Sequence, residues 1–157
     1  MRGPWPRASG AVAAAALATT GALHAVWVFS AWPFSSESEG GLYLVGDPEV
    51  WAPPLPTAAV AGALFAGAYL ALAASRLVPR PGPGWIYRLG NSGLIAVMVA
   101  RGAGGWVFNA GAAQEFVTWN TRLYSPLCLA IALLVTLAWL GDRDRDRVRD
   151  HSQEALR

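Results

Sequence analysis

The sequence predicts an all-α integral membrane protein, an antiparallel four-helix bundle that crosses the membrane four times with both termini in the cytoplasm. Three observations predict this fold. The 157-residue chain is 54% hydrophobic and 14% charged, whereas soluble domains carry roughly 25% charged residues. Its apolar residues fall into four runs near the ~20 residues that a membrane-crossing helix needs. All 12 basic residues are Arg, and ten of them lie on one side of the membrane that these runs imply.

The four runs define the domain organisation. We expect the membrane spans at residues 10–32, 57–76, 88–108 and 123–140. They form one transmembrane domain over residues 10–140. Inside lipid the backbone must satisfy its own hydrogen bonds, so each run is predicted to be a helix. Residues 57–75 and 123–140 contain no Asp, Glu, Lys, Arg or His, although a helix of a soluble bundle would keep a polar face.

Residues 1–9 are expected to be a short cytoplasmic segment before the first span. This segment and the Ala-rich run behind it also resemble a secretory signal, for which Thr20-Gly21-Ala22 is a tolerable cleavage site. The apolar run continues to Trp32, however, and a signal core has only ~7–15 residues. An uncleaved span that ends before Pro33 is therefore favoured, because proline cannot extend the helix.

The distribution of Arg determines the expected orientation. Arg residues precede the first span, flank the connection between the second and third, and follow the fourth; residues 33–56 contain none. By the positive-inside rule both termini are cytoplasmic. The charged tail, residues 141–157, alternates Asp and Arg, and a helix there would place like charges at i,i+4. We expect a solvated, mobile tail, with a weak hold on anionic lipid as the alternative.

Small residues at helical spacing predict how the spans pack. Helices in lipid associate through small residues that let their backbones approach closely. The predicted packing face of the second span consists of Ala59, Ala63, Gly67, Ala71 and Ser75. We expect this face to meet Ala14, Ala18 and Ala22 of the first span, or to meet a second copy of the protein or a membrane-protein partner.

Polar side chains inside the spans are the candidate functional residues. The predicted ligand-binding residues are His24, Trp27, Arg101, Asn109, Tyr124 and Cys128. In the expected topology they come from three helices and lie at similar depth in the outer half of the bilayer. We therefore expect them to converge on a polar pocket for a lipid headgroup or another small polar ligand.

Arg101 carries most of this hypothesis. An Arg near the bilayer centre costs ~2.5–3.5 kcal/mol on the insertion scale, and no predicted span contains Asp or Glu. The remaining partners are a loop carboxylate such as Glu115, backbone carbonyls, lipid phosphate or an anionic ligand. Two interpretations stay open. In the first, Arg101 has a structural role and either snorkels to the interface or binds a loop carboxylate. In the second, Arg101 supplies the positive charge at the bottom of a ligand pocket.

The other polar residues have structural alternatives as well. His24 either forms a neutral hydrogen bond between helices, contacts the ligand or transfers protons. Cys128 is a packed small residue or a redox thiol, and the chain has no second Cys to form a disulfide with it.

Motifs, the placement of the two His and the net charge restrict the classes of function. The sequence contains no catalytic motif of the common hydrolase, kinase or dinucleotide-binding types. The two His are expected on opposite sides of the membrane, so we expect no metal site and no cofactor. A formal charge of +2 with dispersed Arg does not fit a nucleic-acid binder. The first function hypothesis is therefore a ligand-binding membrane protein. The second is an accessory subunit of a membrane complex, and the third is an enzyme that uses His24 and Arg101.

Three segments resemble a known family. His24-Ala-Val-Trp27, Arg101-Gly102 and Arg122-Leu-Tyr-Ser-Pro-Leu-Cys128 are similar to small bacterial membrane proteins of the domain of unknown function 3995. The resemblance covers about residues 10–140 and implies four helices in a bacterial membrane, with no established activity. It also implies that members often carry Asp where this chain has Asn120, so an amide stands here in place of one candidate acidic partner of Arg101.

Overall fold

The computed structural model describes residues 5–154, and within them the side chains of all residues except 108 and 143–154. These residues form helices and connecting loops, without a strand. In chain order the helices are α1 (Trp5–Trp27), α2 (Glu37–Leu44), α3 (Pro54–Ala74), α4 (Gly84–Ala103), α5 (Gly105–Phe108), α6 (Gln114–Trp119), the π-helical turn η1 (Asn120–Tyr124) and α7 (Ser125–Glu154). The all-α prediction is thus confirmed for the described part of the chain.

The core lies where α1 packs between α3 and α7. Its buried residues are Ala13, Ala14, Leu17, Leu64, Ala68, Ala71, Ile131 and Val135. Many of them are Ala, which lets the helix backbones approach closely. The approach is closest at Gly10, where a Cβ would meet the Ser75 hydroxyl and would lie 2.8 Å from Ala71 O.

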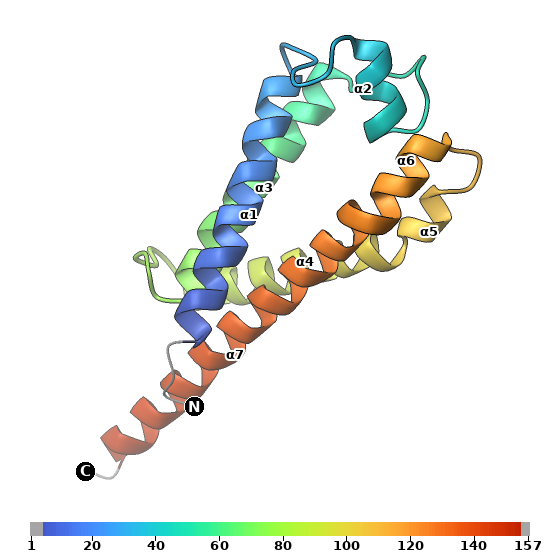
Figure 1. Ribbon diagram of the computed structural model, residues 1–157. Helices are drawn as coiled ribbons and strands as arrows, with labels where there is room; N and C mark the ends of the chain where they lie inside the picture. Colours follow the sequence, from blue (N-terminus) through green and yellow to red (C-terminus); the bar gives the residue numbers. More distant parts are fainter. Residues whose placement is uncertain (1–4, 155–157) are drawn as a thin grey trace.

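The long helices form two pairs that diverge. α1 lies beside α3, and α4 runs beside α7; the pairs meet at one end of the molecule and splay apart toward the end that carries α2, α5 and α6 (Figure 1). The start of α1 and the last turns of α7 lie at the same end (Figure 1). At that end Ser75 Oγ donates to Pro6 O over 3.0 Å, which ties the end of α3 to the start of α1.

An ion-pair cluster that the sequence analysis did not anticipate closes this end. Asp142 of α7 is buried and accepts hydrogen bonds from Arg76 Nε at 2.8 Å and Arg80 Nη1 at 2.7 Å. Arg76 follows α3 with a left-handed backbone, φ 56°, and Leu77 N–H bonds to Leu72 O across the helix end, a Schellman-type stop. The connection between α3 and α4 is therefore attached to α7.

The helix boundaries differ from the expected spans at both ends of the chain. α1 ends at Trp27, before the predicted end at Trp32, because Trp27 Nε1 donates to Trp32 O at 3.0 Å and closes a turn there. α7 continues as a helix to Glu154, whereas the charge pattern predicted a mobile tail. The backbone is helical there in spite of the like charges at i,i+4.

The connection expected to lie outside contains a short helix, α2. Ser36 Oγ accepts from Glu39 N–H at 3.1 Å, and Glu39 in turn accepts from Ser35 N–H at 2.8 Å and from the Ser35 hydroxyl. This reciprocal arrangement resembles a capping box. The hydrogen bonds from Ser35, its side chain first, lower the pKa of Glu39.

Within residues 5–154, three helical segments are long and apolar enough to cross a membrane by length and composition. They are Trp5–Trp27, Pro54–Ala74 and Gln114–Asp142. α4 has 20 residues but contains Arg88, Asn91 and Arg101. The prediction of a membrane protein is therefore supported in its coarse form, by three such helices.

Candidate functional site

A hydrogen-bonded polar cluster joins the end of α4 to the turn η1. Arg101, two residues before the end of α4, donates from Nη1 to Asn120 Oδ1 at 3.1 Å. Asn120, the first residue of η1, is 0% exposed, and Arg101 is half-buried. The guanidinium that sequence reasoning singled out is thus held by a fully buried neutral amide.

The amide of Asn120 is bonded at both of its ends. Asn120 Nδ2 donates to Gly105 O at 2.7 Å and to Asn109 Oδ1 at 2.8 Å. Ser125 Oγ approaches Asn120 Oδ1 at 3.3 Å. One side chain therefore connects α4, α5 and the start of α7, which orients Arg101 by fixing its acceptor.

Glycine makes this close packing possible. A Cβ at Gly105 would meet the Ser125 hydroxyl and would lie 3.4 Å from Asn120 Nδ2. A Cβ at Gly102 would lie 2.7 Å from Leu129 Cγ and 3.0 Å from Ser125 O. Residues with side chains at these two positions would push the end of α4 and the start of α5 away from the start of α7 and would disturb the Arg101–Asn120 hydrogen bond beside them.

The wide turn that carries Asn120 follows from Pro126. Proline has no N–H and its ring collides with the carbonyl four residues before it, here that of Arg122. The helix responds with a π turn, in which Ser125 N–H bonds to Asn120 O, five residues back. Such π turns occur often at functional sites. The Tyr-Ser-Pro-Leu-Cys run is therefore the local cause of the backbone geometry around Asn120.

Three further candidate residues lie around this cluster. Asn109 Nδ2 reaches Thr121 Oγ1 at 3.3 Å. Tyr124 OH donates to Tyr43 O at 3.2 Å, which links η1 to α2. Arg101 lies close enough to Tyr124 and Cys128 to act on both electrostatically. Arg101, Asn109, Tyr124 and Cys128 therefore belong to one region of the structure.

The other two candidates, His24 and Trp27, form a separate pair on α1. Their ring centroids are 4.9 Å apart. His24 Nδ1 lies 2.9 Å from Thr20 O, and Trp27 Nε1 bonds to Trp32 O. These contacts of His24 and Trp27 all lie in α1 or in the turn behind it.

The predicted packing face of α3 is divided between buried and exposed positions. Gly67, Ala71 and Ser75 are buried against neighbouring helices, whereas Ala59 and Ala63 are exposed. The buried positions in the first half of α3 are Thr57, Ala61 and Leu64. A series of residues at strict i,i+4 spacing drifts around the helix, because the period of the helix is 3.6 residues. The buried side of α3 therefore contains only part of that series.

Sequence reasoning did not select Asn120, Ser125 or Gly105 as site residues. Two signals pointed to this position: Asn120 departs from the acidic residue implied by the resemblance, and Pro126 stands inside an apolar helix. Among the described residues, no group of three or more His, Cys, Asp or Glu is arranged to hold a metal ion.

The comparisons with known proteins give one match. A family model described as "Protein of unknown function (DUF3995)" matches residues 17–135. No curated protein and no solved structure matches the chain. The matched region contains every residue of the Arg101–Asn120 cluster.

Proposed function

The chain belongs to the DUF3995 family of proteins of unknown function, and we propose that it is a multi-pass protein of the bacterial cell membrane that binds an anionic phosphate group through Arg101. The phosphate belongs to a lipid headgroup or to a small soluble ligand. The observation that carries the proposal is the hydrogen bond from Arg101 to the buried, neutral Asn120.

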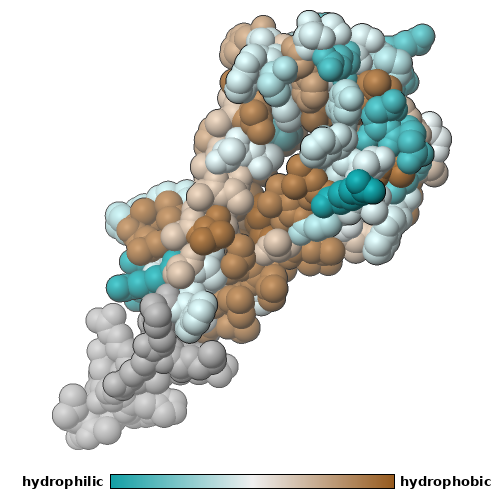
Figure 2. Space-filling view, in the orientation of Figure 1, coloured by the Kyte–Doolittle hydropathy of each residue, from teal (hydrophilic) through white to brown (hydrophobic). Residues whose placement is uncertain are grey.

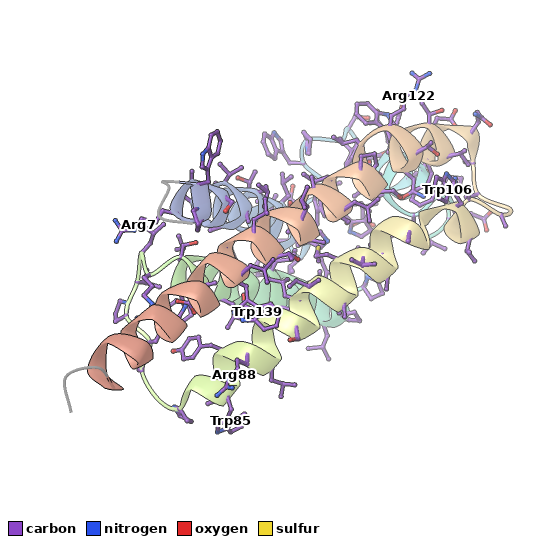
Figure 3. All side chains as sticks on the ribbon, turned by 90° about the horizontal axis from the view of Figure 1, so that it is seen from below. Arg7, Trp85, Arg88, Trp106, Arg122 and Trp139 are labelled. Carbon is purple, nitrogen blue, oxygen red and sulfur yellow. The ribbon has the colours of Figure 1, made fainter. Side chains whose placement is uncertain are left out.

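The first part of the proposal is that α4 also spans the membrane, in addition to the three helical segments named above. Its 20 residues rise by ~30 Å, the thickness of a hydrocarbon core. Trp85 in its first turn is 59% exposed, and Trp106 just beyond its last residue is 71% exposed; the two lie toward opposite ends of the molecule (Figure 3). Exposed Trp at both ends is typical of helices that meet both interfaces.

The surface of the molecule supports the same arrangement. Apolar surface covers the middle of α7, and hydrophilic surface gathers toward the ends (Figure 2). Leu129, Leu133 and Leu137 are exposed at i,i+4 spacing on α7, as expected of a helix side that faces lipid. With four spans and the Arg-rich ends inside, both termini lie in the cytoplasm. A reporter enzyme fused to the C-terminus tests this orientation, because activity outside the cell membrane would contradict it.

The second part of the proposal concerns the ligand. Arg remains charged at every physiological pH and pairs well with phosphate oxygens. The amide of Asn120 orients Arg101 and leaves its positive charge unchanged, because an amide is neutral. Arg101 precedes Trp106 by five residues, which would be a rise of about 8 Å in an unbroken helix and is interrupted here by the turn at Gly104. A Trp at the headgroup level therefore keeps the long side chain of Arg101 within reach of phosphate.

Thermal unfolding in a neutral detergent tests ligand binding. Phosphatidylglycerol should stabilise the wild type, by about 2.7 kcal/mol at 100 times its dissociation constant, and phosphatidylcholine should not. The stabilisation should disappear in Arg101→Gln and persist in Arg88→Gln, which removes an exposed Arg from the other end of α4. Inorganic phosphate in a parallel titration distinguishes the two sources. Equal stabilisation of wild type and Arg101→Gln by phosphatidylglycerol would contradict the proposal.

A second candidate function is that of an accessory subunit. The observation that favours it is the satisfied amide of Asn120, which locks α4 and α5 to η1, together with the exposed Ala59 and Ala63 on α3. In this case the polar cluster only holds the helices, and the small residues of α3 contact a membrane-protein partner or a second copy. Stoichiometric co-purification of a partner that Ala63→Leu abolishes would support this function over ligand binding.

A further inference from the structure

The short helix α5 has one packed side and one open side. On the packed side, Gly105 is buried and lies against Ser125. On the open side, Trp106 and Val107 are 71% and 76% exposed. Trp106 lies at the end of the molecule that also carries Arg122 (Figure 3). Two adjacent, large apolar side chains are therefore presented together at this end.

This open side is preceded in the sequence by exposed apolar residues of α4. Ala96, Ala100 and Ala103 follow one another at i,i+3 or i,i+4 spacing and are all exposed. Trp106 and Val107 are the next positions in this series, three and four residues after Ala103. Each residue of the series is apolar. An exposed apolar series on α4 thus leads in the sequence, across the turn at Gly104, to the exposed Trp106 and Val107 of α5.

We propose that α5 lies at the headgroup–acyl boundary of the outer leaflet, with Trp106 and Val107 inserted among the lipids. This inference rests on the proposed membrane span of α4. An indole ring favours this level because its body is apolar and its N–H is polar. Arg122, exposed at the same end, lies where phosphate groups accept hydrogen bonds.

Lipid fits this surface better than a second protein does. A stable protein interface buries roughly 800 Å² on each partner, and a large aromatic side chain contributes about 150–250 Å². Trp106 and Val107 are the large apolar side chains of a surface that otherwise consists of Ala residues, and they offer much less contact area than such an interface needs. Insertion also has a consequence for the cluster: Gly105 O accepts from Asn120, so the depth of α5 sets the depth of Arg101.

A fluorescent depth probe tests the inference. The single Cys, Cys128, is replaced by Ala, and the full chain is reconstituted in vesicles of phosphatidylglycerol and phosphatidylcholine. An NBD label is then attached to Val107→Cys, to Val97→Cys in the middle of α4, or to Ser38→Cys on exposed α2. Quenchers are lipids with a nitroxide near the headgroup, lipids with a nitroxide deep in the chain, and aqueous iodide.

The label at position 107 should emit at shorter wavelength than that at 38 and lose most emission to the shallow nitroxide. The label at 97 should lose most emission to the deep nitroxide, and the label at 38 to iodide. Quenching at 107 by iodide alone, with 97 still in lipid, would overturn the inference and leave the four-span proposal standing. Iodide quenching of the label at position 97 would contradict both the inference about α5 and the four-span proposal. A label at 107 that is shielded from every quencher until the protein is diluted in lipid would indicate a contact between copies and would also overturn the inference.

Discussion

Replacing Asn120 by Leu removes the centre of the polar cluster and keeps the branching of the side chain at Cγ. The substitution deletes the acceptor of Arg101 and the donor to Gly105 O and Asn109 Oδ1. A hydrogen bond to a charged group contributes roughly 1.5–3 kcal/mol and a neutral one about 1 kcal/mol. Without the longer contact from Ser125 Oγ at 3.3 Å, these three bonds amount to about 4 kcal/mol, or to about 2 kcal/mol if each has the mean of ~0.6 kcal/mol measured between membrane helices.

Asn91→Leu is the matched control. Asn91 is 1% exposed on α4, its Nδ2 bonds to Tyr87 O in its own helix, and its Oδ1 has no hydrogen-bond partner among the described residues. Leu at this position removes an unsatisfied buried acceptor, which costs roughly 1–3 kcal/mol when present. The same substitution at equal burial should thus leave the stability unchanged or raise it.

The free energy of unfolding of both variants is measured by denaturant titration in mixed micelles, with helical circular dichroism as the signal. Asn120→Leu should lose about 2–4 kcal/mol, and Asn91→Leu should lose none. A loss below about 1 kcal/mol for Asn120→Leu, or equal losses in the two variants, would refute the reasoning that the cluster is held by specific hydrogen bonds.

Further predictions concern close approach, charge and pH. Gly10→Ala should destabilise the folded protein by about 1–3 kcal/mol, because its Cβ would collide with the Ser75 hydroxyl. Gly62→Ala, whose Cβ would have nothing within 4 Å, should stabilise the folded protein by up to about 1 kcal/mol. Thermal unfolding of both variants tests this pair of predictions. Asp142→Asn should cost about 1–2 kcal/mol by loss of its two ion pairs, one of them to a half-exposed Arg, and the loss should shrink in high salt. The pKa of Glu39 is lowered in the folded state, so its carboxylate stabilises the folded state above the unfolded pKa. This contribution is lost as the pH falls through the folded pKa. Proteolysis of residues 33–53 should therefore accelerate in that pH range in the wild type, and a Glu39→Gln variant should show no such acceleration.

The helical architecture could be predicted from the sequence because apolar runs of ~20 residues have few alternatives. The start of α1 was harder to place, since Pro6 stands in its first turn, where a proline is tolerated. The helix α2 was missed although Ser36 and Glu39 have capping-box spacing. Its Gly40 and Gly41 argue against a helix locally, but both are buried where Trp51 and the backbone at Val50 pack closely. Tertiary contacts override the local preference at those positions.

The candidate site could be predicted only in part. Arg101 was singled out as a residue that needs a partner, because a charge near the centre of a span is costly, and in the structure it donates to Asn120. Its partner Asn120 was not selected, since an amide near the start of a helix has no comparable cost until the π turn buries it. The contacts of His24 and Trp27 lie within α1 and the turn behind it. The long helix pairs diverge (Figure 1), and no periodicity in one sequence predicts how far they do so.

Native mass spectrometry of the purified protein tests the central claim most directly, since it counts the phospholipids that stay bound. The wild type and Asn91→Leu, released from micelles containing equal amounts of phosphatidylglycerol and phosphatidylcholine, should retain phosphatidylglycerol preferentially. Arg101→Gln should lose this preference while it remains folded by circular dichroism. Equal retention of phosphatidylglycerol by wild type and Arg101→Gln would contradict a phosphate site at Arg101.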